Sequence, residues 1–223
     1  MCGRYTLTSA GDVAGEELGL EEAPELEARY NISPGRQAPV VQVSGSTRRL
    51  IQAHWGFSPA KRGGRFLINA RSETVDELPS FARAFESRRC LVPASGFFEW
   101  KKQGVSRAPY YLRLVSQEIF AMAGLWRSDA GTDGGSYVIL TTTANELVGE
   151  IHDRMPVILG RAHFDAWLDP SNHEVESLLR LLQPISADLM VTHPVSSYVN
   201  SALNEGARCV VEVEPEPQQQ SLF

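Results

Sequence analysis

The chain has 223 residues, which lies at the upper end of the usual single-domain range, so one domain with one core is expected. Its composition, 43% hydrophobic and 22% charged residues, is that of an ordinary globular protein and excludes extensive disorder. The net charge of −6 argues at first against nucleic acid as a partner, because phosphate binding requires Lys and Arg.

The basic residues are concentrated in one part of the chain. Residues 48–113 contain 13 Lys and Arg against 5 Asp and Glu, a net charge of +8, while the remainder carries −14. We therefore predict that this middle third supplies a basic face for DNA. The alternative is a solvated surface that happens to be basic.

The beginning of the chain, MCGRYTLTS, is polar where a signal peptide requires an apolar run, and no window reaches the ~18 apolar residues of a membrane span. A cytoplasmic protein is expected, associated with the nucleoid when bound to DNA. The three cysteines, Cys2, Cys90 and Cys209, have no CxxC spacing, so reduced thiols are expected. No pair of histidines has the spacing of metal ligands, and neither a metal nor a cofactor is expected.

In chain order, residues 9–20 predict one short helix, and the Pro and Gly content of residues 32–38 predicts a loop. The middle of the chain contains short segments rich in aromatic and β-branched residues and separated by turns. Strands are predicted there over residues 90–94, 97–101, 110–115, 119–124 and 136–142. This spacing favours an antiparallel meander or barrel over βαβ units.

A capping box predicts the next helix, because the Thr143 hydroxyl and the Glu146 carboxylate can each satisfy a backbone amide of the other residue. This helix should run from Ala144 towards His152. Further helices are predicted over 162–168 and 174–182, and late strands over 189–193 and 207–213. After Val213, Glu-Pro-Glu-Pro and a run of Gln predict an extended tail.

Cys2 becomes the first residue if Met1 is removed, which happens when the second residue is small. The mature chain then begins with a 1,2-aminothiol, whose α-amine has a pKa of ~7.7–8.0 and whose thiol titrates near ~8.5. Both groups are nucleophiles. With an aldehyde, the amine forms a Schiff base and the thiol closes onto it as a thiazolidine. The alternative is that Cys2 is only a small residue after the start codon.

The segment Gly96-Phe-Phe-Glu-Trp100 predicts a second chemical group. Strand alternation places Phe98 and Trp100 on one face, with Phe97 and Glu99 on the other. A carboxylate beside aromatic rings tends to have a raised pKa, which suits a proton shuttle. The alternative is a surface Glu on an edge strand.

His152 lies at the end of the predicted helix and directly precedes the strand-like Pro-Val-Ile-Leu segment. Side chains often converge on a cleft at such a junction. The alternative is a buried structural His bonded to a carbonyl.

Six motifs, taken together and in this order, resemble the SRAP (SOS response-associated peptidase) family, whose members are abasic-site processing proteins. They are MCGRYT, WGFSP from Trp55, NARSET from Asn69, RCLVPASGFFEW from Arg89, HDRMPVIL from His152 and VSSYVNS from Val195. Ser72 departs from the usual Ala, which should be harmless. The resemblance implies one α+β domain over residues 1–213, a largely antiparallel, barrel-like sheet system with flanking helices, followed by a tail over 214–223.

Position by position, the resemblance implies that Cys2 is the crosslinking residue, with Asn69, Glu99 and His152 around it. Asn69 would align the amine and thiol with the aldehyde, Glu99 would move protons, and His152 would stabilise the hydroxyl of the open sugar. The predicted activity is a covalent thiazolidine crosslink to an abasic site in single-stranded DNA. It would protect the site during replication, with self-reversal by lyase-like chemistry.

The expected DNA contacts are phosphate contacts by Arg4 and Arg71 and base stacking on Trp100, together with contacts from Trp55 and Thr141. A single strand brings the aldehyde to a cleft without the cost of unpairing. The peptidase activity in the family's name is a separate hypothesis, in which the same Cys only processes Met1. Proteolysis of other proteins is not favoured.

Two other classes remain open. Glutamine amidotransferases of the N-terminal-nucleophile type also begin Met-Cys-Gly, although their sequences continue differently. A non-catalytic single-strand binding module would make Cys2 incidental.

The tail ends in Gln-Gln-Ser-Leu-Phe and resembles the bacterial sliding-clamp-binding peptide, with Gln219, Leu222 and Phe223 as the binding residues. Gln220 stands where Leu is common in that motif. The alternative is a disordered end with stray apolar residues.

Overall fold

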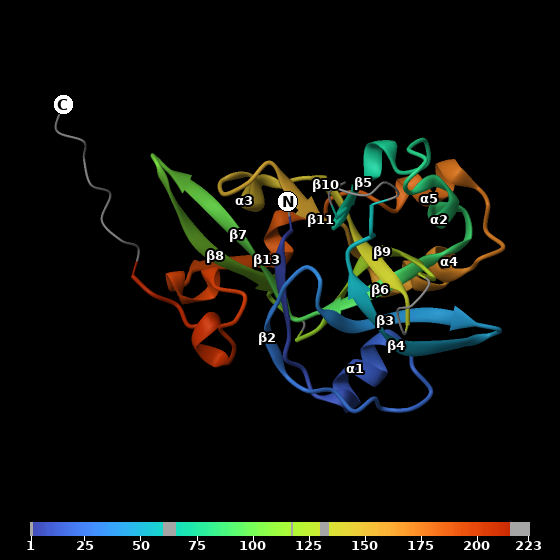
Figure 1. Cartoon of the computed structure of the whole chain (residues 1–223), viewed down its shortest axis with the longest axis horizontal. Helices are drawn as coiled ribbons and strands as arrows, with labels where there is room; N and C mark the ends of the chain where they lie inside the picture. The colour runs from blue at the N-terminus through green and yellow to red at the C-terminus, as the bar shows by residue number, and fades with distance from the viewer. Residues whose placement is uncertain (1, 60–65, 117, 130–133, 215–223) are drawn as a thin grey trace.

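The computed structural model describes residues 2–59, 66–116, 118–129 and 134–214 (Figure 1). The clamp-motif residues Gln219, Leu222 and Phe223 lie outside these ranges. No helix within the described ranges is both long and apolar enough to cross a membrane.

One sheet contains five antiparallel strands in the order β13-β8-β7-β1-β2. The strands are β1 (Arg4–Leu7), β2 (Arg29–Ile32), β7 (Gly96–Gln103), β8 (Ser106–Leu114) and β13 (Met190–Pro194). The first strand of the chain is therefore an interior strand, because both of its edges are paired. This fixes the backbone that follows Cys2.

The second sheet has the order β11-β10-β4-β3-β6-β9-β12, with β5 also paired to β10. Pairing of β9 with β10 closes it into a ring, as the sequence predicts. Its strands are β3 (Gln37–Ser44), β4 (Thr47–Trp55), β5 (Asn69–Arg71), β6 (Arg89–Ala94), β9 (Phe120–Arg127), β10 (Ser136–Thr143), β11 (Arg154–Pro156) and β12 (Ile158–Leu159). The α-helices in the described part of the chain are short and flank the sheets: α1 (Gly11–Leu18), α2 (Ala82–Ser87), α3 (Glu146–Gly149), α4 (Phe164–Leu168) and α5 (Val175–Arg180).

Three aromatic residues join β1 to the ring. Trp55 is fully buried, its indole lies edge-on to Tyr5 at 5.2 Å between ring centroids, and it stacks on Tyr137 at 6.3 Å. The hydroxyls of Tyr5 and Tyr137 are 2.7 Å apart, so two buried polar groups satisfy each other. The beginning of the chain is thus locked against the core.

A smaller apolar cluster covers the other face of the five-stranded sheet. It consists of Phe98, Tyr111, Val195, Val199 and Cys209. This cluster holds the segment that follows β13, a run of 3-10 turns, on the sheet.

Gly96, at the start of β7, is a glycine because the side chain of Tyr111 on β8 packs closely against its backbone. A Cβ on Gly96 would lie 2.3 Å from the Tyr111 hydroxyl, well inside van der Waals contact. Tyr111 uses that hydroxyl to bond Thr6 on β1, at 2.8 Å. Glycine at position 96 therefore lets β7 and β8 present Tyr111 to the first strand.

The structure corrects three sequence predictions. Residues 207–213 do not form a strand; Ala207–Cys209 is a 3-10 turn, followed by a single bridge between Val195 and Glu212. The predicted helix from Ala144 towards His152 is reduced to α3. The 32–38 loop is only a turn between β2 and β3.

The capping residue of α3 also differs from the prediction. Asn145, not Thr143, caps α3 by accepting the Val148 amide at 3.0 Å. Thr143 is still the last residue of β10, where it lies opposite Arg154. Because β10 continues to Thr143, the helix can begin only after it.

Candidate active site around Cys2

Cys2 lies directly before β1, between the two sheets. Its side chain is fully buried, and Sγ lies 3.9 Å from the Arg4 carbonyl oxygen. Burial raises the pKa of the Cys2 thiol, and the negative charge of Glu99 raises it further. The thiol is therefore held in its neutral form, and it lies close enough to Glu99 to feel its charge.

Asn69 is the first residue of β5 and approaches Cys2 from the ring sheet. Its Nδ2 donates a hydrogen bond to the Cys2 carbonyl oxygen at 2.9 Å. Its Oδ1 is buried and has no hydrogen-bond partner within the described part of the chain. One end of the amide thus fixes the Cys2 backbone, and the other end presents an acceptor to the same space.

Glu99 reaches the site from β7. Pairing with β1 places Phe98 opposite Arg4, so the next residue of β7 lies towards Cys2. The predicted alternation is confirmed, because Phe97 packs in the main core while Phe98 and Trp100 belong to the smaller cluster.

The Glu99 side chain is only 2% exposed. Burial raises the pKa of the carboxyl, and the charge of nearby His152 acts in the opposite direction. The alternative, a surface Glu on an edge strand, is excluded, since β7 lies between β1 and β8. A raised pKa makes a carboxyl a better proton donor and acceptor for catalysis than a fully solvated one.

His152 follows α3 in the turn that leads into β11. Its Nδ1 lies 3.0 Å from the Arg154 amide nitrogen and 2.9 Å from Asp153 Oδ1. The ring is partly exposed, so it is not the buried structural His of the alternative interpretation. Since its charge acts on Glu99, the two groups belong to one electrostatic site.

The structure brings the four predicted residues together from four separate segments. Cys2 precedes β1, Asn69 begins β5, Glu99 lies on β7 and His152 precedes β11. No cluster of three or more His, Cys, Asp or Glu side chains arranged for a metal occurs among the described residues.

The predicted DNA contacts divide into two groups. Arg71 is exposed, and Trp100 is partly exposed with its indole N–H donated to Asn200 Oδ1 at 2.8 Å. Both side chains are therefore accessible. Arg4 is partly buried, and its guanidinium donates to Asn31 Oδ1 and the Val199 carbonyl at 2.8 Å each. A phosphate contact by Arg4 stays a prediction and would use its remaining donors.

Trp55 and Thr141 require a correction. Both are fully buried. The Trp55 indole donates to the Ile68 carbonyl at 2.9 Å, and the Thr141 carbonyl accepts from Arg154 at 2.6 Å. In this conformation they support the site from within the core and do not reach a DNA strand.

Sequence reasoning missed two positioning residues. Arg154 donates to Glu73 Oε2 at 2.8 Å and to the Thr141 carbonyl, which fastens the segment after Asn69 to β10. Asn31 donates to the carbonyls of Ser201 and Asn204 at 2.9 and 2.8 Å. Arg154 lies inside a quoted motif, but the partners of Asn31 are far away in sequence, so no local signal could have identified its role.

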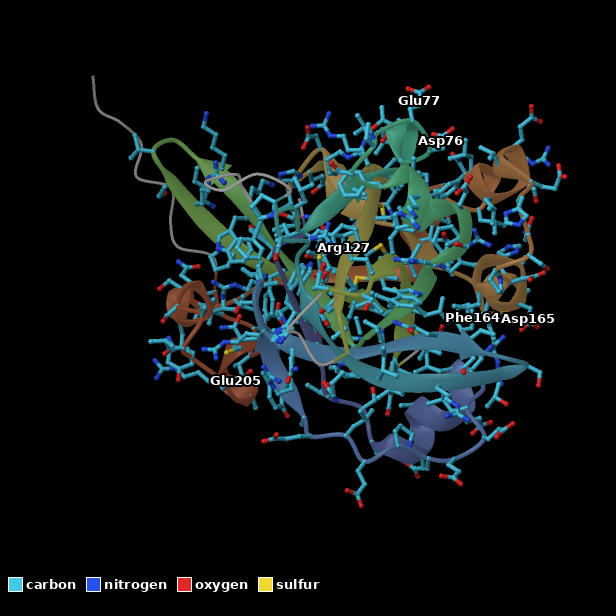
Figure 2. All side chains as sticks on the ribbon, turned by 45° about the vertical axis from the view of Figure 1, so that its right-hand side comes forward. Asp76, Glu77, Arg127, Phe164, Asp165 and Glu205 are labelled. Atoms are coloured by element: carbon cyan, nitrogen blue, oxygen red, sulfur yellow. The ribbon has the colours of Figure 1, made fainter. Side chains whose placement is uncertain are left out.

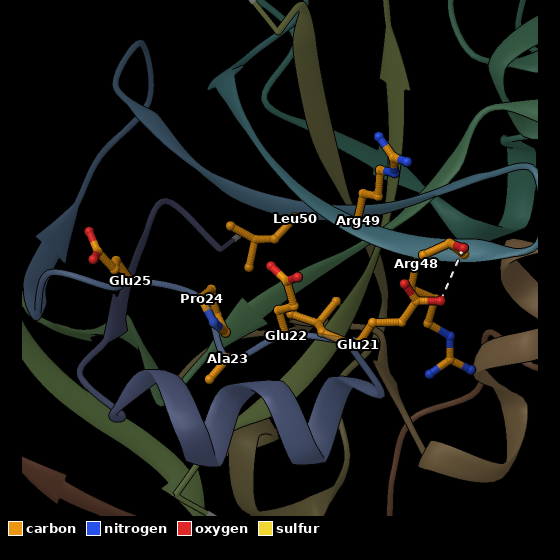
Figure 3. Close-up of a pocket in the computed structure, with 10 residues that line it drawn as sticks. Glu21, Glu22, Ala23, Pro24, Glu25, Arg48, Arg49 and Leu50 are labelled. Atoms are coloured by element: carbon orange, nitrogen blue, oxygen red, sulfur yellow. Dashed lines mark hydrogen bonds between the residues drawn. The ribbon is translucent and has the colours of Figure 1, made fainter.

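Some acidic groups lie away from this site. Glu77, Asp165 and Glu205 lie at the periphery of the fold (Figure 2). A hollow of about 500 Å³ beside α1 is lined by Glu21, Glu22 and Glu25 with two arginines (Figure 3), and by none of the four site residues. Its glutamates would repel a phosphate chain, so the site around Cys2 is the better candidate for a nucleic acid.

The fold and the site together define a single-domain α+β protein in which the cysteine at position 2 is bonded by the Asn69 amide, with a buried carboxyl and an imidazole from two further segments in the same site. The family model described as SOS response associated peptidase (SRAP) matches residues 1–202. The chain belongs to this family.

Known relatives extend over nearly the whole chain. It is 38% identical to the abasic site processing protein YoaM of Bacillus subtilis, over 93% of this chain and 96% of that protein. It is 29% identical to YedK of Escherichia coli, which has the same descriptive name, over 96% and 100%. A crystal structure of a protein from Bacteroides thetaiotaomicron has the same fold, with a TM-score of 0.81, 24% identity and coverage of 96% and 100%.

Proposed function

We propose that this protein processes abasic sites by bonding Cys2 covalently to the aldehyde of the lesion in single-stranded DNA. The observation that carries the proposal is the hydrogen bond from Asn69 to the Cys2 carbonyl, beside a buried Glu99 of raised pKa. The names of its relatives, abasic site processing proteins, support the same substrate.

The reaction balances without an oxidant or a cofactor. After removal of Met1, the Cys2 α-amine attacks the C1′ aldehyde carbon, and the carbinolamine loses one water to give an imine. The Cys2 sulfur then adds to the imine carbon, and the thiol proton passes to the imine nitrogen. The product is a five-membered thiazolidine, and the only by-product is water.

The electrostatics of the site favour this order of steps. Because the pKa of the thiol is raised, the amine is the first nucleophile and the thiol closes the ring second. Glu99 donates a proton to the departing hydroxyl, recovers one from the iminium nitrogen, and then relays the thiol proton to the imine nitrogen, a shuttle role that suits a buried carboxyl of raised pKa. His152 stabilises the hydroxyl that develops when the sugar ring opens, and Asn69 keeps Cys2 in line.

The test compares Cys2→Ala with Cys209→Ala, since both wild-type thiols are buried and reduced. Incubation with an abasic single-stranded oligonucleotide should give a denaturation-resistant adduct in the parent and in Cys209→Ala, but none in Cys2→Ala. Cys2→Ser should give at most a labile imine. Binding to undamaged single strands should survive in all three variants, and a stable adduct in Cys2→Ala would refute the proposal.

The same experiment separates the competing classes. A glutamine amidotransferase would release ammonia from glutamine without DNA, whereas we expect no glutaminase activity. A non-catalytic binding module would bind single-stranded DNA but form no covalent product. A chain that keeps Met1 should also fail to crosslink, because a peptide nitrogen cannot form an imine.

A further inference from the structure

The ends of β7 and β8 form a two-stranded arm that projects beyond the rest of the fold (Figure 1). Pairing of β8 with β13 stops at Tyr110 opposite Pro194, and one more hydrogen bond joins Pro109 to Val195. Residues 101–108, here called the arm, pair only with each other among the described strands. Its turn exposes Val105 completely.

The arm carries positive charge in an arrangement that is unfavourable for the isolated protein. Lys102 lies directly opposite Arg107, and both side chains are exposed. Like charges directly opposite each other destabilise a strand pair. Neither residue forms an ion pair within the described part of the chain. An anion placed between them would remove this repulsion.

The arm follows directly after the site along β7, and its Lys102 side chain lies on the face of the strand opposite to Glu99. Glu99 and Trp100 belong to β7 and immediately precede it. Because side chains alternate along a strand, Lys102 is on the same face as Trp100, and Arg107 opposite completes that face. A base stacked on Trp100 would therefore leave the adjoining phosphates above Lys102 and Arg107.

A hollow at the base of the arm provides space beside Arg107. It measures about 440 Å³ and is lined by Arg107, Tyr110, Ser196 and Ser197 among others. Guanidinium and hydroxyl groups are suitable partners for phosphate oxygens. Glu214 also lines this hollow, and its negative charge disfavours an isolated anion held inside it. The arrangement is better suited to a DNA strand that runs along the arm.

We propose that the arm is a second contact surface for single-stranded DNA, in which Lys102 and Arg107 bind backbone phosphates on one side of the lesion. This inference rests on the proposed function and adds the path of the strand. Along β7, Lys102 lies two residues beyond Trp100, or ~7 Å at ~3.3 Å per residue. At ~3.4 Å per stacked nucleotide, the contacted phosphates would lie about two nucleotides from the base stacked on Trp100.

The test uses undamaged single-stranded DNA, so that it does not depend on crosslinking chemistry. The variant is Lys102→Ala with Arg107→Ala. The matched control is Arg83→Ala with Arg180→Ala, which removes the same charge from α2 and α5 on the opposite side of the molecule (Figure 1). Melting temperatures should stay equal or rise in the arm variant, because a repulsive pair is removed.

The salt dependence of the dissociation constant gives the expected result. Two lost phosphate contacts lower the slope of log Kd against log salt by about 1.4. The ratio of variant to parent Kd should therefore shrink about 7-fold between 50 and 200 mM salt. The control variant should keep the parent slope, and an arm variant that also keeps it overturns the proposal.

A second experiment locates the position of the contact along the DNA. Oligonucleotides with one abasic site and flanks of different length on either side are bound to the parent and to the arm variant, both carrying Cys2→Ala. The penalty should require a flank of about two nucleotides on one side and disappear when that flank is removed. A penalty that is equal for all flank lengths overturns the proposal. Adduct formation by the parent is scored separately, so failure of the arm and failure of the crosslinking proposal remain distinct.

Discussion

Replacing Asn69 by Ala should separate chemistry from stability. The substitution removes the 2.9 Å hydrogen bond to the Cys2 carbonyl, and such a bond contributes ~0.5–1.5 kcal/mol. It also removes Oδ1, a buried acceptor without a partner in the described structure, and an unsatisfied group of this kind costs ~1–3 kcal/mol. Because the two effects oppose each other, the free energy of unfolding should change by less than about 1 kcal/mol.

The rate of adduct formation should respond much more strongly to the same substitution. Without Asn69 the Cys2 backbone loses its fixed position, and a misplacement of ~1 Å at a reacting group can cost ~100-fold in rate. We expect the rate at saturating abasic DNA to fall roughly 10- to 100-fold, with affinity for undamaged DNA unchanged.

The assay follows the covalent product in single-turnover time courses, with chemical denaturation measured in parallel. Asn172→Ala is the matched control, because Asn172 also donates its Nδ2 to a carbonyl, that of Ala166, at 3.0 Å, but away from the site. The reasoning is refuted if Asn69→Ala reacts within about 3-fold of the parent, or if its rate loss is matched by Asn172→Ala.

Three further predictions concern Glu99, Trp55 and Arg71, and a fourth rests on the sequence of the tail. Since the folded-state pKa of Glu99 lies above the ordinary value of 4.5, the native state loses stability as pH rises from 4.5 through that raised pKa. Glu99→Gln should therefore raise the melting temperature at pH 7–8 more than at pH 4. The same substitution should slow both formation and release of the adduct. Equal losses of DNA binding and of adduct chemistry would instead mark Glu99 as structural. Trp55→Ala should lower the free energy of unfolding by ~3–5 kcal/mol, as urea denaturation can measure, because it empties a fully buried site. Arg71→Ala should weaken DNA binding and lower its salt slope by about 0.7, read from binding isotherms at several salt concentrations. A peptide spanning 214–223 should bind the bacterial sliding clamp with roughly micromolar affinity in a titration, and lose it when Leu222 and Phe223 are both replaced by Ala; no saturable binding of the intact peptide would exclude that interaction.

The sequence was most informative where the chemistry depends on local residues. The alternation Phe97, Phe98, Glu99, Trp100 predicted which side chains face the site, because the strand period of two is independent of the remaining fold. The class of fold was also predictable, since short strands separated by turns favour antiparallel pairing.

What the sequence could not provide depends on long-range packing. Trp55 is an aromatic residue in a quoted motif, and only the tertiary structure shows that its indole is enclosed by Tyr5 and Tyr137. The capping box at Thr143 was overridden because β10 extends through that residue to pair with β11. The bonds that Arg4 makes join the first strand to the 199–200 segment, a separation that no local pattern encodes.

The central claim is that Cys2 and the lesion form a thiazolidine, and mass mapping of the adduct tests it most directly. Parent protein lacking Met1 is crosslinked to an abasic oligonucleotide, digested with nuclease and protease, and compared with and without cyanoborohydride. The account predicts a sugar remnant on the Cys2 peptide, with a mass equal to the sum of the two parts less one water. Reductant should leave that mass unchanged, because a closed ring has no imine to reduce. A remnant on a lysine, or a Cys2 peptide that gains two hydrogens with reductant, would contradict the account.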